Sequence, residues 1–272
     1  AALNGTAEHR LKQVIVNLER LRWTNFDFGK KHIEVNIPSF MANVYLNDEV
    51  ILSTRVVTGT AKHQTAEFSD EMTHMIVNPT WHVPDSIASE EYLPQMWQDP
   101  SILRRQNIAM LVKGSGQIVD PEAIDMTLFT ENNFPFLLKQ RPSPNNALGR
   151  VKFMFPNGFN IYLHDTPAKS LFNRDARAYS HGCVRVQKPF ELAYTLLGFQ
   201  ESDPVAKFES VLNTGRETRI DLYEHFKVHI LYRTAFVDID GSLQFREDVY
   251  GRDELVMQAL RAEGLTMPDF NS

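Results

Sequence analysis

The passage Tyr179–Arg185 carries the residue types best suited to covalent chemistry. Cys183 is the only cysteine of the chain, and two histidines lie shortly before it, His164 and His181. A thiol is only a few per cent ionised at pH 7, so a nucleophilic cysteine needs a proton acceptor or a cation beside it. The pattern therefore predicts a cysteine nucleophile with a histidine base. A small buried hydrophobic cysteine is the alternative.

The neighbours of the thiol suit acyl chemistry. Gly182 permits an unusual backbone turn, so that its N–H and that of Cys183 can face a developing oxyanion. Arg185 can stabilise negative charge near the thiol or form an ordinary structural ion pair. His181 competes with His164 as the base, because residues i and i+2 of an extended chain share a face.

The elements that must position these residues are mostly strands. The apolar pattern predicts helices over 11–21, 189–197 and 252–262, and strands over 33–37, 43–46, 50–59, 72–77, 149–155, 159–163 and 226–236. Strands cluster rather than alternate with helices, so the fold class is mainly β, or α+β. We expect the apolar face of the helix over 11–21 to dock on the next domain, with a partner surface as the alternative.

A proline-rich segment interrupts this pattern between residues 84 and 144. Only short helices are expected there, around 86–98 and 101–107. A long segment of this kind inside a β framework predicts an insertion or lid, since long loops in compact domains are often functional. Ordinary connecting structure is the alternative.

Composition excludes several classes of protein. The chain has 272 residues with 28 Lys+Arg against 34 Asp+Glu, and this net charge of −6 argues against a nucleic-acid binder. No apolar run is long enough to span a membrane. The histidines lack metal-ligand spacing, so we expect no metal or other cofactor. The start at Ala1 without Met suggests a trimmed or mature segment, from which an export signal, anchor or upstream domain would have been lost.

The motif around the thiol resembles that of the L,D-transpeptidase (YkuD-type) family. The family pattern is a His, a gap of about 14–17 residues, Ser/Thr-His-Gly-Cys and then Arg or Asn. Here the matching positions are His164 and Ser180-His181-Gly182-Cys183-Val184-Arg185. Further similarity to the large YcbB-like subgroup lies in Asn36-Ile37-Pro38, Asn78–Pro84, Asn146–Phe153 and Leu171–Arg174.

The resemblance implies a domain organisation. The catalytic domain, a YkuD-like β-sandwich or barrel with peripheral helices, would comprise 31–84 and 146–251. An inserted capping subdomain, the lid, would occupy 85–145. An N-terminal helix and linker would span 1–30, and a C-terminal helix and tail 252–272.

The resemblance also assigns roles to residues. Cys183 is implied as nucleophile, His164 as general base, and the Gly182 and Cys183 amides as the oxyanion hole. Asp165 would fix the tautomer of His164 through its backbone carbonyl, although its carboxylate acting directly stays open. His181 and Arg185 would support the site. Substrate contact is predicted for Ser180, for Tyr162, which could instead be a packed aromatic, and for Trp81, which could be an ordinary core tryptophan.

The implied activity is a cell-wall one. Cys183 would form a thioester with the third residue of a peptidoglycan tetrapeptide stem, and an amine of an acceptor stem would resolve it, giving a 3→3 cross-link. Carbapenems would acylate the thiol as inhibitors, and the protein would act in the periplasm or cell envelope, in cell-wall biogenesis and cell shape. An L,D-carboxypeptidase or other hydrolase on the same fold and a non-catalytic peptidoglycan-binding module are the alternatives.

Overall fold

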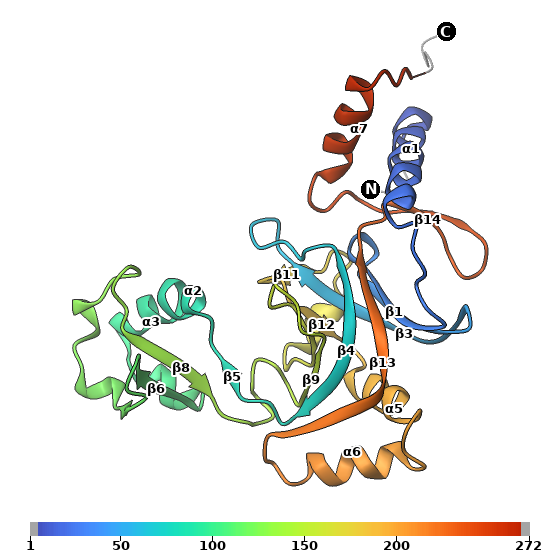
Figure 1. Cartoon of the computed structure of the whole chain (residues 1–272). Coiled ribbons are helices and arrows are strands. Elements are labelled where there is room, and N and C mark those ends of the chain that lie inside the picture. The colour runs from blue at the N-terminus through green and yellow to red at the C-terminus, as the bar shows by residue number, and fades with distance from the viewer. Residues whose placement is uncertain (1–4, 268–272) are drawn as a thin grey trace.

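The main sheet of the computed structural model closes on itself (Figure 1). Within residues 5–267, which the structure describes, nine strands pair in the order β11-β3-β12-β10-β9-β4-β13-β1-β2, and β2 also pairs with β3. Their bounds are β1 (Lys31–Asn36), β2 (Met41–Leu46), β3 (Glu49–Gly59), β4 (Phe68–Val77), β9 (Val151–Met154), β10 (Leu163–His164), β11 (Ala178–Ser180), β12 (Val184–Val186) and β13 (Thr218–Leu231). The predicted α+β class is confirmed, and the β framework is a closed one.

Two long strands make the closure possible. The first part of β3 pairs with β2, while its last residues pair with β12 and β11. In the same way β13 pairs with β4 along most of its length and with β1 over its last residues. Short 3₁₀ turns, η2 (Ile37–Ser39) and η6 (Lys169–Asn173), connect neighbouring parts of this framework.

The interior of the closed sheet is the main hydrophobic core. Alternate strand residues such as Ile33, Met75, Phe153 and Val184 are fully buried, as expected for strands with one buried face. The helices α5 (Pro189–Leu197) and α6 (Pro204–Leu212) add buried side chains, among them Phe208. The bounds of α5 agree with the prediction, whereas α6 was missed.

Residues 81–140 build a second sheet with its own core, on one side of the main sheet (Figure 1). Strands pair there in the order β5-β8-β6-β7. The elements are β5 (Trp81–His82), α2 (Asp85–Ile87), the π-helix η3 (Ala88–Tyr92), α3 (Leu93–Gln98), α4 (Ile102–Arg105), β6 (Ile108–Val112), β7 (Ile118–Val119), η4 (Pro121–Ala123), η5 (Met126–Leu128) and β8 (Phe136–Gln140). The short helices agree with the prediction, but the strands were missed because each is brief and the segment is rich in proline.

Two buried asparagines hold the chain where it enters and leaves this second unit. The side-chain amide of Asn78 donates to the carbonyl of Leu212 at 2.9 Å. That of Asn146 donates to the carbonyl of Pro79 at 3.1 Å. These bonds satisfy backbone carbonyls that form no hydrogen bond within either sheet. They therefore fix the two connecting segments relative to the main sheet.

The helices nearest the two ends of the described chain lie side by side (Figure 1). They are α1 (Ala7–Trp23) and α7 (Arg252–Ala262), and the hairpin β14 (Ala235–Val237) and β15 (Leu243–Phe245) lies next to α1. Across residues 5–267, no helix is both long and apolar enough to cross a membrane. Residues 1–4, expected as part of the N-terminal segment, and 268–272, expected as tail, lie outside the described residues.

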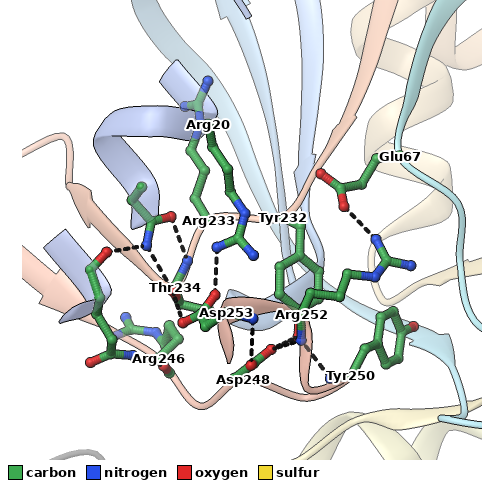
Figure 2. Close-up of polar contacts among 12 residues, drawn as sticks. Arg20, Glu67, Tyr232, Arg233, Thr234, Arg246, Asp248, Tyr250, Arg252 and Asp253 are labelled. Atoms are coloured by element: carbon green, nitrogen blue, oxygen red, sulfur yellow. Dashed lines mark hydrogen bonds and ion pairs between the residues drawn. The ribbon is translucent and has the colours of Figure 1, made fainter. Parts of the chain in front are cut away.

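The prediction that the apolar face of α1 docks on the next domain is wrong. Leu18 and Leu21 are 58% and 50% exposed, while the polar residues Asn17 and Arg20 are buried. Asn17 exchanges two hydrogen bonds with Thr234, and Arg20 forms an ion pair with Asp253 at 2.5 Å (Figure 2). Specific polar bonds, which hydrophobic periodicity does not encode, decide which face of this helix is covered.

Candidate active site

Three neighbouring strands carry one row of polar side chains. His164 on β10 is paired with Arg185 on β12 and with Lys152 on β9. Directly paired residues project to the same face of a sheet, and so does Cys183, two residues before Arg185. The order across the sheet is therefore thiol and guanidinium, then imidazole, then ammonium.

The tautomer of His164 follows from the hydrogen bond of its Nδ1. Its Nδ1 lies against the carbonyl oxygen of Asp165. Because a carbonyl oxygen only accepts, Nδ1 must carry the proton and Nε2 keeps its lone pair. The group that holds the imidazole is thus the backbone carbonyl that the resemblance implied, and Nε2 is left able to accept a proton.

The carboxylate of Asp165 is used elsewhere. It accepts the backbone N–H groups of Arg150 at 2.9 Å and Thr166 at 2.7 Å and forms an ion pair with Lys169. The side chain thereby holds its own backbone in place, and its carbonyl is the group in contact with His164. The open question of whether the carboxylate acts directly on His164 resolves in favour of the main chain.

Gly149 permits the close approach on which this arrangement depends. Its φ is +63°, and a Cβ there would collide with the side chain of Asp165. We expect Gly149→Ala to lower the free energy of unfolding by about 2–4 kcal/mol, from the left-handed backbone and the overpacking together. Urea denaturation measures this. Gly215→Ala is the matched control, because its φ is +64° with no atom within 4 Å of the added Cβ, and an equal loss in both variants would contradict the collision.

The thiol rests away from the imidazole. Cys183 Sγ donates to the carbonyl of Asn160 at 3.6 Å, and within residues 5–267 no hydrogen bond joins it to His164. Burial raises the pKa of Cys183, although hydrogen bonds from the backbone N–H and the hydroxyl of Tyr162 partly offset this. Burial, helped by the Arg185 charge, lowers the pKa of His164 to about 3. The resting pair is therefore a neutral thiol and a neutral imidazole.

This protonation state predicts a simple pH profile for the free thiol. The imidazole stays neutral between pH 4 and 8, so no imidazolium is present to stabilise the thiolate there. Alkylation of Cys183 by iodoacetamide should therefore fall about tenfold per unit as pH drops below 8. Intact-mass kinetics measures the rate. A rate that stays level down to pH 5 would reveal a thiolate–imidazolium pair and contradict the prediction.

The turn before the thiol orients its amide. Gly182 has a φ of +110°, which favours glycine. Its N–H donates to Ser180 Oγ at 3.2 Å, and Ser180 Oγ donates to the carbonyl of Cys183 at 2.5 Å. Cys183 N–H has no acceptor within residues 5–267. Of the two amides implied for the oxyanion hole, that of Cys183 is the unengaged one, and the Ser180 hydroxyl, predicted to contact substrate, is committed to the turn.

A second layer holds this turn in place. Thr65 Oγ1 donates to the carbonyl of Gly182 at 2.8 Å and accepts the N–H of Gly59 at 2.9 Å. The Tyr250 hydroxyl, beside the polar network at the base of α7 (Figure 2), donates to the carbonyl of Gly59 at 2.8 Å. Segments far apart in the sequence thus converge on the backbone next to Cys183.

A cavity of about 670 Å³ lies between the main sheet and the second unit. The predicted residues Trp81, Tyr162, His164, Ser180, His181, Cys183 and Arg185 all line it. The Tyr162 ring lies 5.7 Å from that of His164, while Trp81 also packs against the second core, 6.3 Å from Tyr92. Among residues 5–267, no three His, Cys, Asp or Glu side chains are grouped to hold a metal ion.

His181 has a partner from the second unit. Its Nε2 lies 2.7 Å from Glu91 of η3, and its ring lies 4.7 Å from that of His63. These contacts turn the imidazole toward the rim of the cavity, where it joins the two units. The competing assignment of His181 as the base thus has no contact in its favour.

Sequence reasoning missed Lys152, Glu91 and Asn160, which all line the cavity. The sequence held a usable signal that Lys152 lies at the site, because it is a charged residue between the apolar Val151 and Phe153 of a predicted strand. The strand predicted over 159–163 shortens to β10, because the Asn157 side chain bonds the backbone of the preceding turn. That turn presents the Asn160 carbonyl to the thiol.

Comparison with known proteins agrees with the motif. Residues 30–217 match the model of the YkuD family, described as the L,D-transpeptidase catalytic domain. A curated protein of Haemophilus influenzae, named "Putative L,D-transpeptidase", is 35% identical over 249 residues, covering 90% of this chain and 49% of that protein. The chain thus spans about half the length of that relative.

Solved structures resemble the chain more loosely. An L,D-transpeptidase from Mycobacterium smegmatis is 9% identical with a TM-score of 0.33, covering 74% of this chain and 58% of that chain. L,D-transpeptidase 3 from Mycobacterium tuberculosis, in complex with a faropenem-derived adduct, is 10% identical with a TM-score of 0.35, covering 74% and 60%. The assignment rests on the family model, which matches more than half of the chain: this protein belongs to the YkuD family of L,D-transpeptidase catalytic domains.

Proposed function

We propose that this chain forms 3→3 cross-links between peptidoglycan stem peptides through a thioester on Cys183. The observation that carries the proposal is the imidazole of His164, held by the Asp165 carbonyl with Nε2 unprotonated, in the same cavity as the thiol. A cysteine with an oriented base is the arrangement that covalent acyl transfer requires.

In the first half-reaction the donor is a tetrapeptide stem. The thiol turns from Asn160 to His164, Nε2 takes its proton, and Sγ bonds to the carbonyl carbon of the third residue. As the tetrahedral intermediate collapses, the bond from carbon to nitrogen breaks, and the His164 imidazolium gives its proton to that nitrogen. The terminal D-residue leaves as a free amino acid, and the third residue stays on Cys183 as a thioester.

Two donors stabilise the oxyanion. One is the Cys183 N–H, which has no acceptor within residues 5–267. The other is the Tyr162 hydroxyl, since burial raises the pKa of Tyr162 above its usual value and the phenol keeps its proton. Donors aimed at the developing charge supply much of the rate enhancement in acyl transfer.

In the second half-reaction an acceptor stem brings its side-chain amine. The amine nitrogen bonds to the thioester carbon, the bond from carbon to sulfur breaks, and His164 takes the proton that the amine loses. That proton returns to the thiolate. Residues 85–145 act as a capping lid that excludes water, which would otherwise hydrolyse the thioester. The Glu91–His181 contact supports a closed position for this lid.

The activity implies a place and partners for the protein. Donor and acceptor stems of peptidoglycan are the substrates, carbapenems are acylating inhibitors, and the protein works in the periplasm or cell envelope. A hydrolase on the same site would pass the acyl group to water instead of the amine.

Turnover of a purified tetrapeptide stem, followed by mass spectrometry, tests the proposal. A transpeptidase yields a dimer containing one tetrapeptide and one tripeptide, together with one free D-residue per bond. Accumulation of tripeptide alone would identify an L,D-carboxypeptidase, and no turnover with a confirmed free thiol would overturn acyl transfer.

A further inference from the structure

The cavity holds two cations that no protein group neutralises. Lys152 and Arg185 form no hydrogen bond or ion pair within residues 5–267, and Arg185 Nε is buried without a partner. Lys152 is half-buried, and its Nζ lies 5.5 Å from the centre of the Tyr162 ring. Unpaired charges in a partly desolvated site cost stability, so their presence points to an anionic ligand.

The carboxylates nearby are already engaged. Glu91 pairs with His181. Glu217, whose charge reaches Lys152, accepts the N–H of Thr80 and lies beyond ion-pair distance of the ammonium. The single thiol can balance at most one of the two cations when it ionises, so the other is left for an anion of the ligand.

The order of the groups across the sheet matches the order of atoms in the donor. Arg185 belongs to β12 and Cys183 directly precedes that strand, while His164 belongs to β10 and Lys152 to β9. In a stem that ends one residue beyond the attacked carbonyl, the scissile carbon is followed by the leaving nitrogen, one Cα and a free carboxylate. These atoms span about 4 Å, which is about one of the two strand spacings of about 4.8 Å that separate β12 from β9, and the long side chain of Lys152 has to bridge the remainder. With the carbon at the thiol and the nitrogen at His164, the carboxylate faces β9.

We infer that Lys152 binds the free carboxylate of the leaving D-residue and so selects stems that end one residue beyond the attacked carbonyl. This inference rests on the proposed function and names a specificity-determining residue for it. Arg185, two residues from the thiol, balances the thiolate, whereas Lys152 acts on the leaving side. A stem extended by another residue, or one with a terminal amide, presents no charge at this position.

Two donor peptides test the inference: a tetrapeptide stem with its free terminal carboxylate and the same peptide as the terminal carboxamide. We expect the wild type to prefer the acid about 10- to 100-fold in kcat/KM, the range of a charge-assisted hydrogen bond. Lys152→Gln should lower kcat/KM for the acid by that factor and leave the amide unchanged, and Lys152→Arg should retain much of the preference. Lys207→Gln, the same charge change on α6 far from the cavity, is the control.

The possible failures are distinguishable. A wild type that uses both donors equally leaves the proposed function standing and overturns the carboxylate assignment. So does an equal loss for both donors in Lys152→Gln, accompanied by a changed pH profile of Cys183 alkylation, which would assign Lys152 to the thiol. A wild type that uses neither donor, although Cys183 is alkylated normally, overturns the proposed function and the inference with it.

Discussion

Replacing Cys183 with alanine should abolish covalent acylation and lower turnover of the tetrapeptide donor by roughly 10⁴-fold or more. The thiol is the only one in the chain, so no neighbouring sulfur can take over. Its burial and neutral resting state do not weaken this expectation, because the proton passes to His164 only when the carbonyl is attacked. Intact-protein mass spectrometry after incubation with a carbapenem measures the adduct directly, and peptide turnover gives the rate.

The controls for Cys183→Ala exclude unfolding and reaction at another residue as causes of the result. The Cys183→Ala protein should unfold in urea close to the wild-type midpoint, since a thiol forms only weak hydrogen bonds, here to Asn160 and from Tyr162. The wild type should gain a single adduct mass. An adduct of equal yield in Cys183→Ala would move the nucleophile elsewhere, and unchanged cross-linking in that variant would make the chain a non-catalytic module.

Replacing His164 with glutamine should lower kcat for donor turnover by about 10²- to 10⁴-fold, the usual contribution of general acid–base catalysis. Glutamine keeps the volume of the buried site but supplies no group that can accept the thiol proton and then release it to the leaving nitrogen. His181→Gln should lose no more than about tenfold, because its imidazole pairs with Glu91 at the rim. Discontinuous peptide-turnover assays on both variants give the ratio of the two losses in kcat.

The comparison of these two histidines is the sharpest test of which one is the base. A larger loss in His181→Gln than in His164→Gln would reverse the assignment. Equal losses, with both proteins folded, would mean that the contact between the second unit and the thiol turn matters as much as the base. Glu91→Gln separates these cases, since it removes only the charge of the partner of His181.

Much of the fold was accessible from the residue pattern. The helices at 189–197 and 252–262 were predicted with the bounds that the structure has, because an N-terminal proline or a following glycine marks their ends. The strands predicted over 43–46 and 50–59 pair as β2 and β3, joined at Asn47 and Asp48, which both adopt positive φ. The strands of the second unit and α6 were missed, because short elements among prolines leave little periodicity.

The local sequence by itself identified the candidate reactive groups, the Ser-His-Gly-Cys turn and the histidine that precedes it, and the family to which the chain belongs. These signals are local, because a motif encodes its own turn and its own reactive group. Only the tertiary structure decided that the Asp165 carbonyl contacts His164 while its carboxylate does not, that the face of α1 with Val16, Asn17 and Arg20 is the covered one, and that Lys152 lines the cavity. Each of those depends on strand register or on hydrogen bonds between segments distant in sequence, for which the order of residues along one chain carries no periodic signal.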